Sequence, residues 1–379
     1  MFKPLRHMPA ALVTALMLGL TGASQASPIQ PRHADEVIER LPPVVRSASA
    51  TALAPDPTQA VAEARQWLAI ARRDGDPRPA GRALARLARW QQDATAPAEV
   101  VVMIATLEQY LHRFDTAVRR LQALVARDPA QPQAWLLLAS LHRLQGRLAE
   151  SDRACVQLQR QRVQPYADAC LAENQSLRGE FGPARQAFAT LLVRSGNAGE
   201  RAWLLTSLAE LEVRANDVAA ADQAWRDALK AELSSYSAIG HADFLLDQQR
   251  PQEAWNAVAA QERSDGVLLR LAIAARRLQR PDAAALQQEL LARYAQADLR
   301  PESTGHDRER AMFALDLLDR PAQALAAARR NVAQQNEAID LWLLARSAKA
   351  TGNAKARAEV LALAGRIGMV DKRIEGLGP

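Results

Sequence analysis

The chain is poor in the residues that build catalytic and metal centres. Two of its 379 residues are cysteines and six are histidines. After residue 26 the histidines stand singly, and the sequence contains no His-Glu-x-x-His, Gly-x-Ser-x-Gly, Cys-x2-Cys or phosphate-binding Gly-x4-Gly-Lys-Ser/Thr motif. We therefore expect a protein that is not an enzyme and that holds no metal or cofactor. An enzyme assembled from dispersed residues is the weaker alternative.

Lysines and aromatic residues are also scarce. The chain has lysine only at positions 3, 230, 349, 355 and 372, and aromatic residues make up 4% of it. Its net charge of +6 is carried by arginines spread along the chain, with the densest run between Arg65 and Arg89. A nucleic-acid surface needs clustered positive charge together with stacking aromatics or a known motif. The sequence therefore predicts no nucleic-acid partner, whereas an acidic partner could dock on the arginine-rich run.

Long apolar runs are absent, apart from a short one near the start. Lys3 and Arg6 precede an apolar stretch from Ala10 to Leu20, and small residues follow at 23–26. This pattern predicts a secretory signal peptide over residues 1–26, because a membrane span needs about 20 apolar residues. We expect export, cleavage and no stable membrane insertion afterwards; an uncleaved anchor is the alternative. The Ala- and Arg-rich composition is typical of a GC-rich bacterial genome, which makes the periplasm the expected location.

Residues 27–58 are rich in Pro, Ala and Ser and are expected to form a linker. Beyond them the chain repeats itself. The phrases Arg-Pro-Gln-Glu-Ala (250–254), Arg-Pro-Asp-Ala-Ala (280–284) and Arg-Pro-Ala-Gln-Ala (320–324) each stand between two apolar helical stretches. Proline suits the first position of a helix, where its missing N–H would have had no partner. A repeat of this size predicts stacked helical hairpins.

The clearest hairpin runs from about residue 131 to residue 163. Its first helix is expected over 134–145, Gly146 ends that helix in the left-handed conformation, and the second helix follows over 148–159. The same plan can be placed about nine times between residues 59 and 366, and residues 367–379 remain as a C-terminal tail. Ala and Leu dominate, and both favour helices. The predicted fold is an all-α superhelical solenoid.

This pattern resembles the tetratricopeptide repeat. The resemblance rests on Trp135, Leu138, Ala139 and Gly146, on the step of 34 residues, and on Pro129, which closes the preceding unit. It also rests on an alanine near the start of the second helices, at Ala117, Ala184, Ala221, Ala254, Ala284 and Ala324. The chain departs from the family pattern where His112 replaces the usual glycine and Ser151 the usual alanine.

The resemblance implies a concave groove, lined by the first helices, that binds a protein or peptide. On the face opposite the packing alanines we expect the following residues to line it: Gln133, Ser140, Arg143, Tyr166, Glu173, Trp203, Glu210, Tyr236 and Asp243. In three successive hairpins an aromatic residue is followed seven positions later by a carboxylate, which could hold an extended or helical peptide with basic residues. The alternative is that the aromatics cover hairpin ends and the acids are solvated. The Lys/Asn set with which some family members clamp a C-terminal carboxylate is missing.

The two cysteines fall on neighbouring antiparallel helices in this register. Cys155 lies about nine residues before the turn at 163–165 and Cys170 about six after it. A disulfide is therefore feasible in an oxidising compartment, and two buried free thiols are the alternative.

Together these patterns predict a non-catalytic scaffold or assembly adaptor of the bacterial cell envelope. The alternative is an accessory subunit of an envelope system for transport or for polysaccharide or metal handling. The identity of the partner is not readable from the residues.

Overall fold

The computed structural model describes residues 56–74, 76–299 and 306–376, and all regular elements in these ranges are helices. The expected signal peptide and most of the expected linker lie outside the described residues. The helices are α1 (Pro57–Asp74), α2 (Arg78–Arg86), η1 (Ala88–Trp90), α3 (Ala98–Tyr110), α4 (Phe114–Arg127), α5 (Pro132–Leu144), α6 (Leu148–Arg160), α7 (Tyr166–Leu177), α8 (Phe181–Arg194), α9 (Ala198–Ala215), α10 (Val218–Ala231), α11 (Ser235–Asp247), α12 (Pro251–Val258), α13 (Asp265–Arg277), α14 (Ala283–Asp298), α15 (Asp307–Asp316), α16 (Pro321–Val332), α17 (Ala338–Ala350), α18 (Ala354–Ile367) and α19 (Lys372–Glu375).

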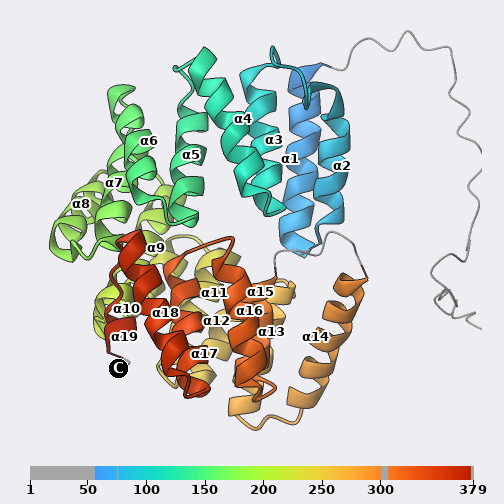
Figure 1. Cartoon of the computed structure of the whole chain (residues 1–379), viewed down its shortest axis with the longest axis vertical. Coiled ribbons are helices and arrows are strands. Elements are labelled where there is room, and N and C mark those ends of the chain that lie inside the picture. The colour runs from blue at the N-terminus through green and yellow to red at the C-terminus, as the bar shows by residue number, and fades with distance from the viewer. Residues whose placement is uncertain (1–55, 75, 300–305, 377–379) are drawn as a thin grey trace, which may run out of the picture. The chain divides into compact units, whose positions relative to one another are not determined.

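Helices α1 to α18 form nine consecutive hairpins in the described part of the chain, so the predicted all-α solenoid is confirmed. Figure 1 follows them from α1 and α2 in blue to α17 and α18 in red. Consecutive helices pack on one another from α1 to α14 and again from α15 to α18. First helices of neighbouring hairpins also touch, as α3 does α5 and α5 does α7. One hairpin cannot cover both faces of its helices, and its neighbours supply the missing apolar contact. None of the described helices is long and apolar enough to cross a membrane.

Small residues set the spacing between the helices. Ala139 and the alanines near the start of most second helices, such as Ala117 and Ala184, are fully buried. Ala284 does not follow this pattern, because it is exposed. Helix α14 begins at Ala283, two residues after Pro281, so its buried face starts at Leu286 instead. The prediction of a packing alanine at 284 was therefore wrong.

The last hairpin returns to the middle of the chain. Asn336, between α16 and α17, donates its backbone N–H to the carbonyl of Leu144 at 2.6 Å, and Val370, after α18, donates to the carbonyl of Leu177 at 2.8 Å. Both acceptors lie at the end of a first helix, where carbonyls lack intrahelical partners. The expected C-terminal tail contains the short helix α19, which packs on α9 and α17. We call Asn336, Glu337 and residues 367–373 the closing segments.

Two glycines make this return possible. Gly146 (φ +73°) and Gly179 (φ +83°) end α5 and α7 in the left-handed conformation. They also lie directly beneath the closing segments: a Cβ at Gly179 would lie 2.9 Å from Cβ of Val370, and one at Gly146 would lie 3.0 Å from Cγ1 of Ile367. Figure 1 shows the end of α18 beside the end of α5. Glycine is therefore needed here both for its backbone conformation and for the space that it leaves.

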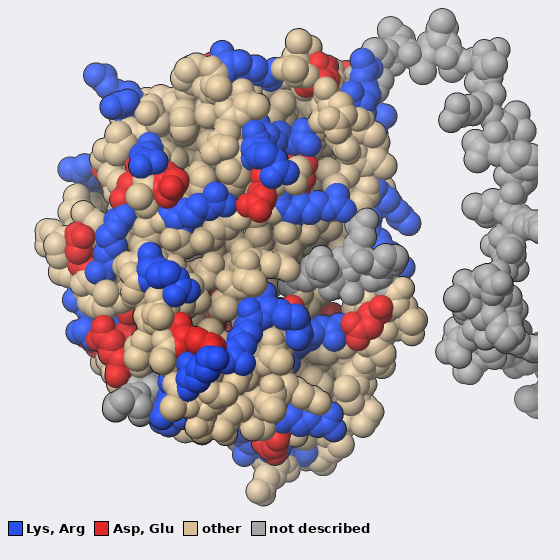
Figure 2. Space-filling view, viewed as in Figure 1, with Lys and Arg blue, Asp and Glu red and all other residues tan. Residues whose placement is uncertain are grey.

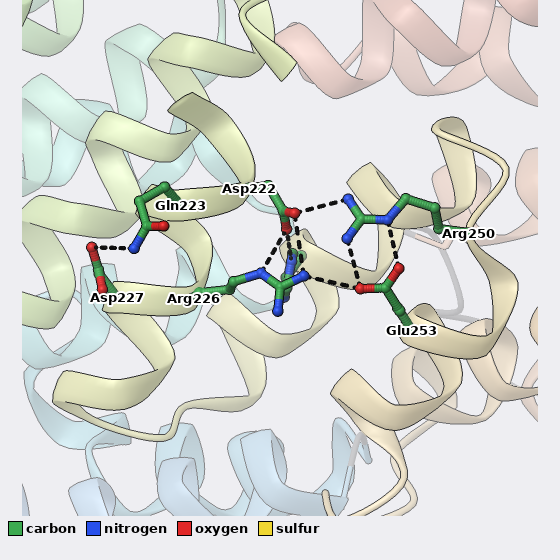
Figure 3. Close-up of polar contacts among 7 residues, drawn as sticks. Asp222, Gln223, Arg226, Asp227, Arg250 and Glu253 are labelled. Carbon is green, nitrogen blue, oxygen red and sulfur yellow. Dashed lines mark hydrogen bonds and ion pairs between the residues drawn. The ribbon is translucent and has the colours of Figure 1, made fainter. Parts of the chain in front are cut away.

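A polar network ties three consecutive helices together on the outer side of the solenoid (Figure 3). Arg250, from the first Arg-Pro phrase, precedes α12 and binds both carboxylate oxygens of Glu253 at 2.6 and 2.7 Å. It also donates to Asp222 of α10 at 2.9 Å. Arg226 contacts both acids, and Nε2 of His241 in α11 lies 3.0 Å from Oδ1 of Asp222. The Arg-Pro phrase thus starts a helix and links it to the preceding hairpin.

Replacing Gly179 with alanine should weaken the contact between the end of α7 and the closing segment at Val370, and so lower the stability of the fold. Gly352 (φ +63°) ends α17 in the same conformation, but a Cβ there would meet nothing within 4 Å. Gly352→Ala should cost about 1 kcal/mol from the left-handed conformation alone, and Gly179→Ala about 1–3 kcal/mol more from overlap with Val370. Chemical denaturation measures both. Equal losses in the two variants would contradict the assigned contact.

The network of Figure 3 predicts a pH dependence. Partial burial acts to raise the pKa of Asp222, but hydrogen bonds from His241, Arg226 and Arg250 outweigh it and lower the pKa from 3.8 to about 2. The carboxylate therefore stabilises the fold above pH about 4, by roughly 2 kcal/mol, and this contribution is lost as the pH falls towards 2. Asp222→Asn should lower the melting temperature at pH 7 and much less at pH 2.5.

The matched control for this variant is Asp227→Asn on the same helix. Asp227 is half-buried and accepts a hydrogen bond from Gln223 at 3.0 Å (Figure 3). We expect a change below about 0.5 kcal/mol that varies little with pH. A pH-independent loss in Asp222→Asn would argue against the ionic origin of its effect.

Candidate ligand-binding cavity

The first helices and the closing segments surround a cavity of about 750 Å³. Its walls come from α5, α7, α9, α11, α13 and α15 on one side and from the closing segments on the other. The residues that line it include Ser140, Arg143, Glu173, Trp203, Thr206, Ser207, Glu210, Arg214, Trp225, Tyr236, Ser237, Asp243, Asp247, Arg270, Arg308, Glu309, Asn336, Glu337, Met369 and Arg373. The return of the chain turns what would be an open groove into a cavity with a far wall.

Most of the predicted groove residues lie in this cavity. Ser140, Arg143, Glu173, Trp203, Glu210, Tyr236 and Asp243 all line it. Gln133 does not, because it is exposed in the first turn of α5. Tyr166 does not line the cavity either, but its ring packs on that of Trp203 with centroids 5.3 Å apart. The predicted aromatics and carboxylates thus come from three successive first helices, α7, α9 and α11.

Tyr236 and Trp225 are two of the aromatic residues that line the cavity, and they differ in exposure. Tyr236 lines the cavity with 65% of its surface exposed, and its hydroxyl donates to a carboxylate oxygen of Glu210 at 2.7 Å. That carboxylate is the main cause of the raised pKa of Tyr236, and burial raises the pKa of Glu210. The indole of Trp225 is buried against Gly240, where a Cβ would lie 2.5 Å from the ring. Tyr236 therefore offers a ring face to a ligand, whereas Trp225 forms part of the floor.

Two of the three predicted carboxylates are already engaged by arginines of the chain. Arg143 lies 2.5 Å from Glu173, which also accepts from Ser207 at 2.6 Å. Arg270 is 3% exposed and binds both oxygens of Asp243 at 2.7 Å. Planar guanidinium groups suit such two-point contacts. These acids tie neighbouring hairpins together and are therefore not free for a basic ligand. The sequence had led us to expect that they would be free.

Several cavity residues were not foreseen from the sequence. Arg270 stands inside the apolar helix α13, and a charged residue in such a run is a signal that it has a buried partner. Asp307 and Glu309 both lie in the first turn of α15, where Glu309 faces the cavity. Arg308, between them, donates to both oxygens of Asp340 at 2.6 and 2.9 Å and also to Glu337.

Nothing in the cavity has the make-up of a metal centre: within the described residues, no three His, Cys, Asp or Glu side chains are grouped closely enough to hold an ion. The two cysteines lie away from it. Cys155 of α6 and Cys170 of α7 are joined in a disulfide with Cα atoms 5.7 Å apart, and both are buried. On the face of the molecule shown in Figure 2, basic and acidic side chains are intermingled over much of the surface.

The fold and the cavity define the class of this protein: an all-α solenoid of helical hairpins whose first helices surround a ligand-sized space. A family model described as tetratricopeptide repeat matches residues 102–151, which include α4 and α5. The match covers less than half of the chain. A search of curated protein sequences finds no match.

Three solved structures are similar to this chain at low sequence identity. A tetratricopeptide repeat protein from Parabacteroides merdae is 11% identical, with 77% of this chain and 98% of that chain covered and a TM-score of 0.39. Human IFIT1, solved as a dimer with PPP-AAAA, is 12% identical, with coverages of 82% and 73% and a TM-score of 0.46. A chain of the APC/C hetero-tetramer Cut9-Hcn1 is 16% identical with a TM-score of 0.42; 71% of this chain is covered, and about half, 52%, of that one.

The buried pair of Arg270 and Asp243 should stabilise the cavity wall. Asp243→Asn would leave the guanidinium of Arg270 buried without its counter-charge, at a cost of about 3 kcal/mol. The matched control is Glu359→Gln, which breaks a pair with Arg329 whose two side chains are 42% and 43% exposed. That change should cost at most about 1 kcal/mol. Denaturant titration compares them, and losses of equal size would contradict the structural role given to Arg270.

Proposed function

We propose that this protein is a non-catalytic scaffold or assembly adaptor that takes up an extended segment of a protein partner in the cavity. The observation that carries this proposal is the space of about 750 Å³ between the first helices, with the ring of Tyr236 exposed inside it. Clefts of a few hundred to a thousand Å³, with aromatic walls and a few well-placed polar groups, are typical binding sites.

The charged groups of the cavity support binding in preference to chemistry. Arg143 is paired with Glu173, and Arg270 with Asp243, so these side chains hold helices at fixed positions. Paired and bonded in this way, they form a preorganised wall, which lowers the entropy lost when a ligand is fixed. The far wall formed by the closing segments favours a slender occupant, an extended chain, over a folded domain.

We further propose that the protein works in the bacterial cell envelope. This part rests on the signal-peptide pattern of residues 1–26 and on the arginine- and alanine-rich composition. The Cys155–Cys170 disulfide suits an oxidising compartment such as the periplasm.

Site-specific photo-crosslinking in cells tests the proposal. A photoreactive benzoylphenylalanine replaces Tyr236 inside the cavity, or Val193, which is 88% exposed on the outer helix α8, as the matched control. We expect one partner at near-stoichiometric yield from position 236 and none from position 193. The envelope fraction should contain the adduct.

Each of the other results has a defined meaning. A partner captured from 193 and not from 236 would move the interface to the outer face and overturn the cavity proposal. Capture from neither position would reject the adaptor function and would favour an accessory role in envelope transport or polysaccharide handling.

A further inference from the structure

The carboxylates around the cavity outnumber the guanidinium groups that bind them. Arg270 forms an ion pair with Asp243, and Arg308 forms ion pairs with both Glu337 and Asp340. Glu309 lines the same cavity. This cluster joins α11, α13, α15 and α17 and contains four acids and two arginines. At neutral pH its ionised form therefore carries two negative charges in excess.

Glu309 is the residue in which this excess is most evident. In the described part of the chain, no cation lies within ion-pair distance of its carboxylate, in contrast to Asp243 and Glu337. Burial acts to raise the pKa of Glu309, but the charges of Arg308 and Arg270 outweigh it and keep the pKa below its ordinary value. The carboxylate thus faces the cavity without an ion-pair partner among the described residues, an arrangement that favours the entry of a cation.

Tyr236 and Glu210 provide a second, different feature. The Tyr236 ring is exposed within the cavity, and its hydroxyl donates to Glu210, which has no arginine within ion-pair distance among the described residues. A cation over the face of an aromatic ring is attracted by the ring quadrupole, by about 0.5–2 kcal/mol depending on solvation. An exposed ring beside carboxylates is therefore a suitable surface for an ammonium or guanidinium group.

Arg214 indicates that the ligand also carries hydrogen-bond acceptors. It lines the cavity, is 7% exposed and donates through one terminal nitrogen to Ser176, but its Nε–H has no acceptor among the described residues. A buried donor without a partner costs free energy that an acceptor would recover. A peptide offers both features at once, cationic side chains and main-chain carbonyls.

We propose that the cavity recognises a lysine or arginine side chain of an extended peptide segment, held between the ring of Tyr236 and the carboxylates of Glu210, Glu309 and Glu337. The inference rests on the proposed function and specifies the chemistry of its ligand. It assigns the recognition of charge to Glu309, which has no arginine in contact among the described residues, and to Glu337, which shares Arg308 with Asp340. It takes this role away from Glu173 and Asp243, each of which is paired with an arginine of its own.

Fluorescence anisotropy with three labelled peptides tests this inference on the folded protein. The probes are Gly-Ser-Gly-Arg-Ala-Lys-Gly-Ser-Gly, the same peptide with Gln at both basic positions, and the same peptide with Glu there. We expect the basic peptide to bind at least about tenfold more tightly than the neutral one, with a preference that shrinks as salt is raised. The acidic peptide should not bind measurably.

Variants identify the residues responsible. Glu309→Gln and Tyr236→Leu should each weaken binding of the basic peptide about fivefold or more and leave the neutral peptide unaffected. The control is Glu180→Gln, at an exposed position before α8 and outside the cavity lining, which should change neither affinity. Circular dichroism and melting curves confirm that each variant is folded.

Several results would overturn the inference. Equal binding of basic and neutral peptides would remove the charge preference. The proposed function would still stand if benzoylphenylalanine at position 236 cross-links a partner in cells. Binding of none of the peptides would reject the inference outright. Displacement of the basic peptide by spermidine at equal affinity would show that the site takes a free polyamine and would reject the peptide assignment.

Discussion

Two main-chain hydrogen bonds hold the last hairpin against the middle of the chain, and the cavity depends on them. They run from Asn336 to Leu144 and from Val370 to Leu177, so they satisfy carbonyls that the ends of α5 and α7 leave without partners. Trp342 adds a side-chain bond to Asp247 at 2.7 Å. Without these contacts the first helices would line an open groove, and Glu337 would not face Tyr236 across a common space. The shape of the site is therefore set by contacts that lie outside the repeat itself.

The hairpins were predictable from the sequence because their signals are local. Gly146 at the end of a helix, proline at the start of one and alanine at a helix crossing act within a few residues, and repetition makes the pattern clear. The return of the chain was not predictable, because Gln145 and Asn336 are 191 residues apart and no periodicity connects them. The start of α14 was also not predictable from the repeat. Helices α12 and α16 begin at Pro251 and Pro321, whereas α14 begins at Ala283, two residues after Pro281.

The candidate site was foreseen only in part, because the sequence indicates which face of a helix a residue occupies but not which residue it contacts. The periodicity of a first helix predicts which face a residue occupies. Trp203, Glu210 and Tyr236 were therefore expected on one face with Glu173 and Asp243, and all five line the cavity. The periodicity does not state what stands opposite. Arg143 and Arg270 meet their carboxylates across a hairpin boundary, and Glu309 reaches the cavity from the first turn of α15, whose face toward the groove was not among those expected to line it. Such pairings depend on the stacking of whole hairpins, which residue spacing alone does not describe.

The return of the chain also constrains how such a protein can change over generations. In an open solenoid each hairpin contacts only its neighbours, so units can be gained or lost by duplication and deletion. Here the third and fourth hairpins meet the ninth, and the number of hairpins between them fixes the distance that the closing segments must bridge. Insertion or loss of one unit would misplace Asn336 and Val370 by the width of a hairpin and open the cavity. The chain is thus built from repeated units, but the number of hairpins between the third and the ninth is fixed by the closure, so gain or loss of a unit is possible only outside that part of the solenoid.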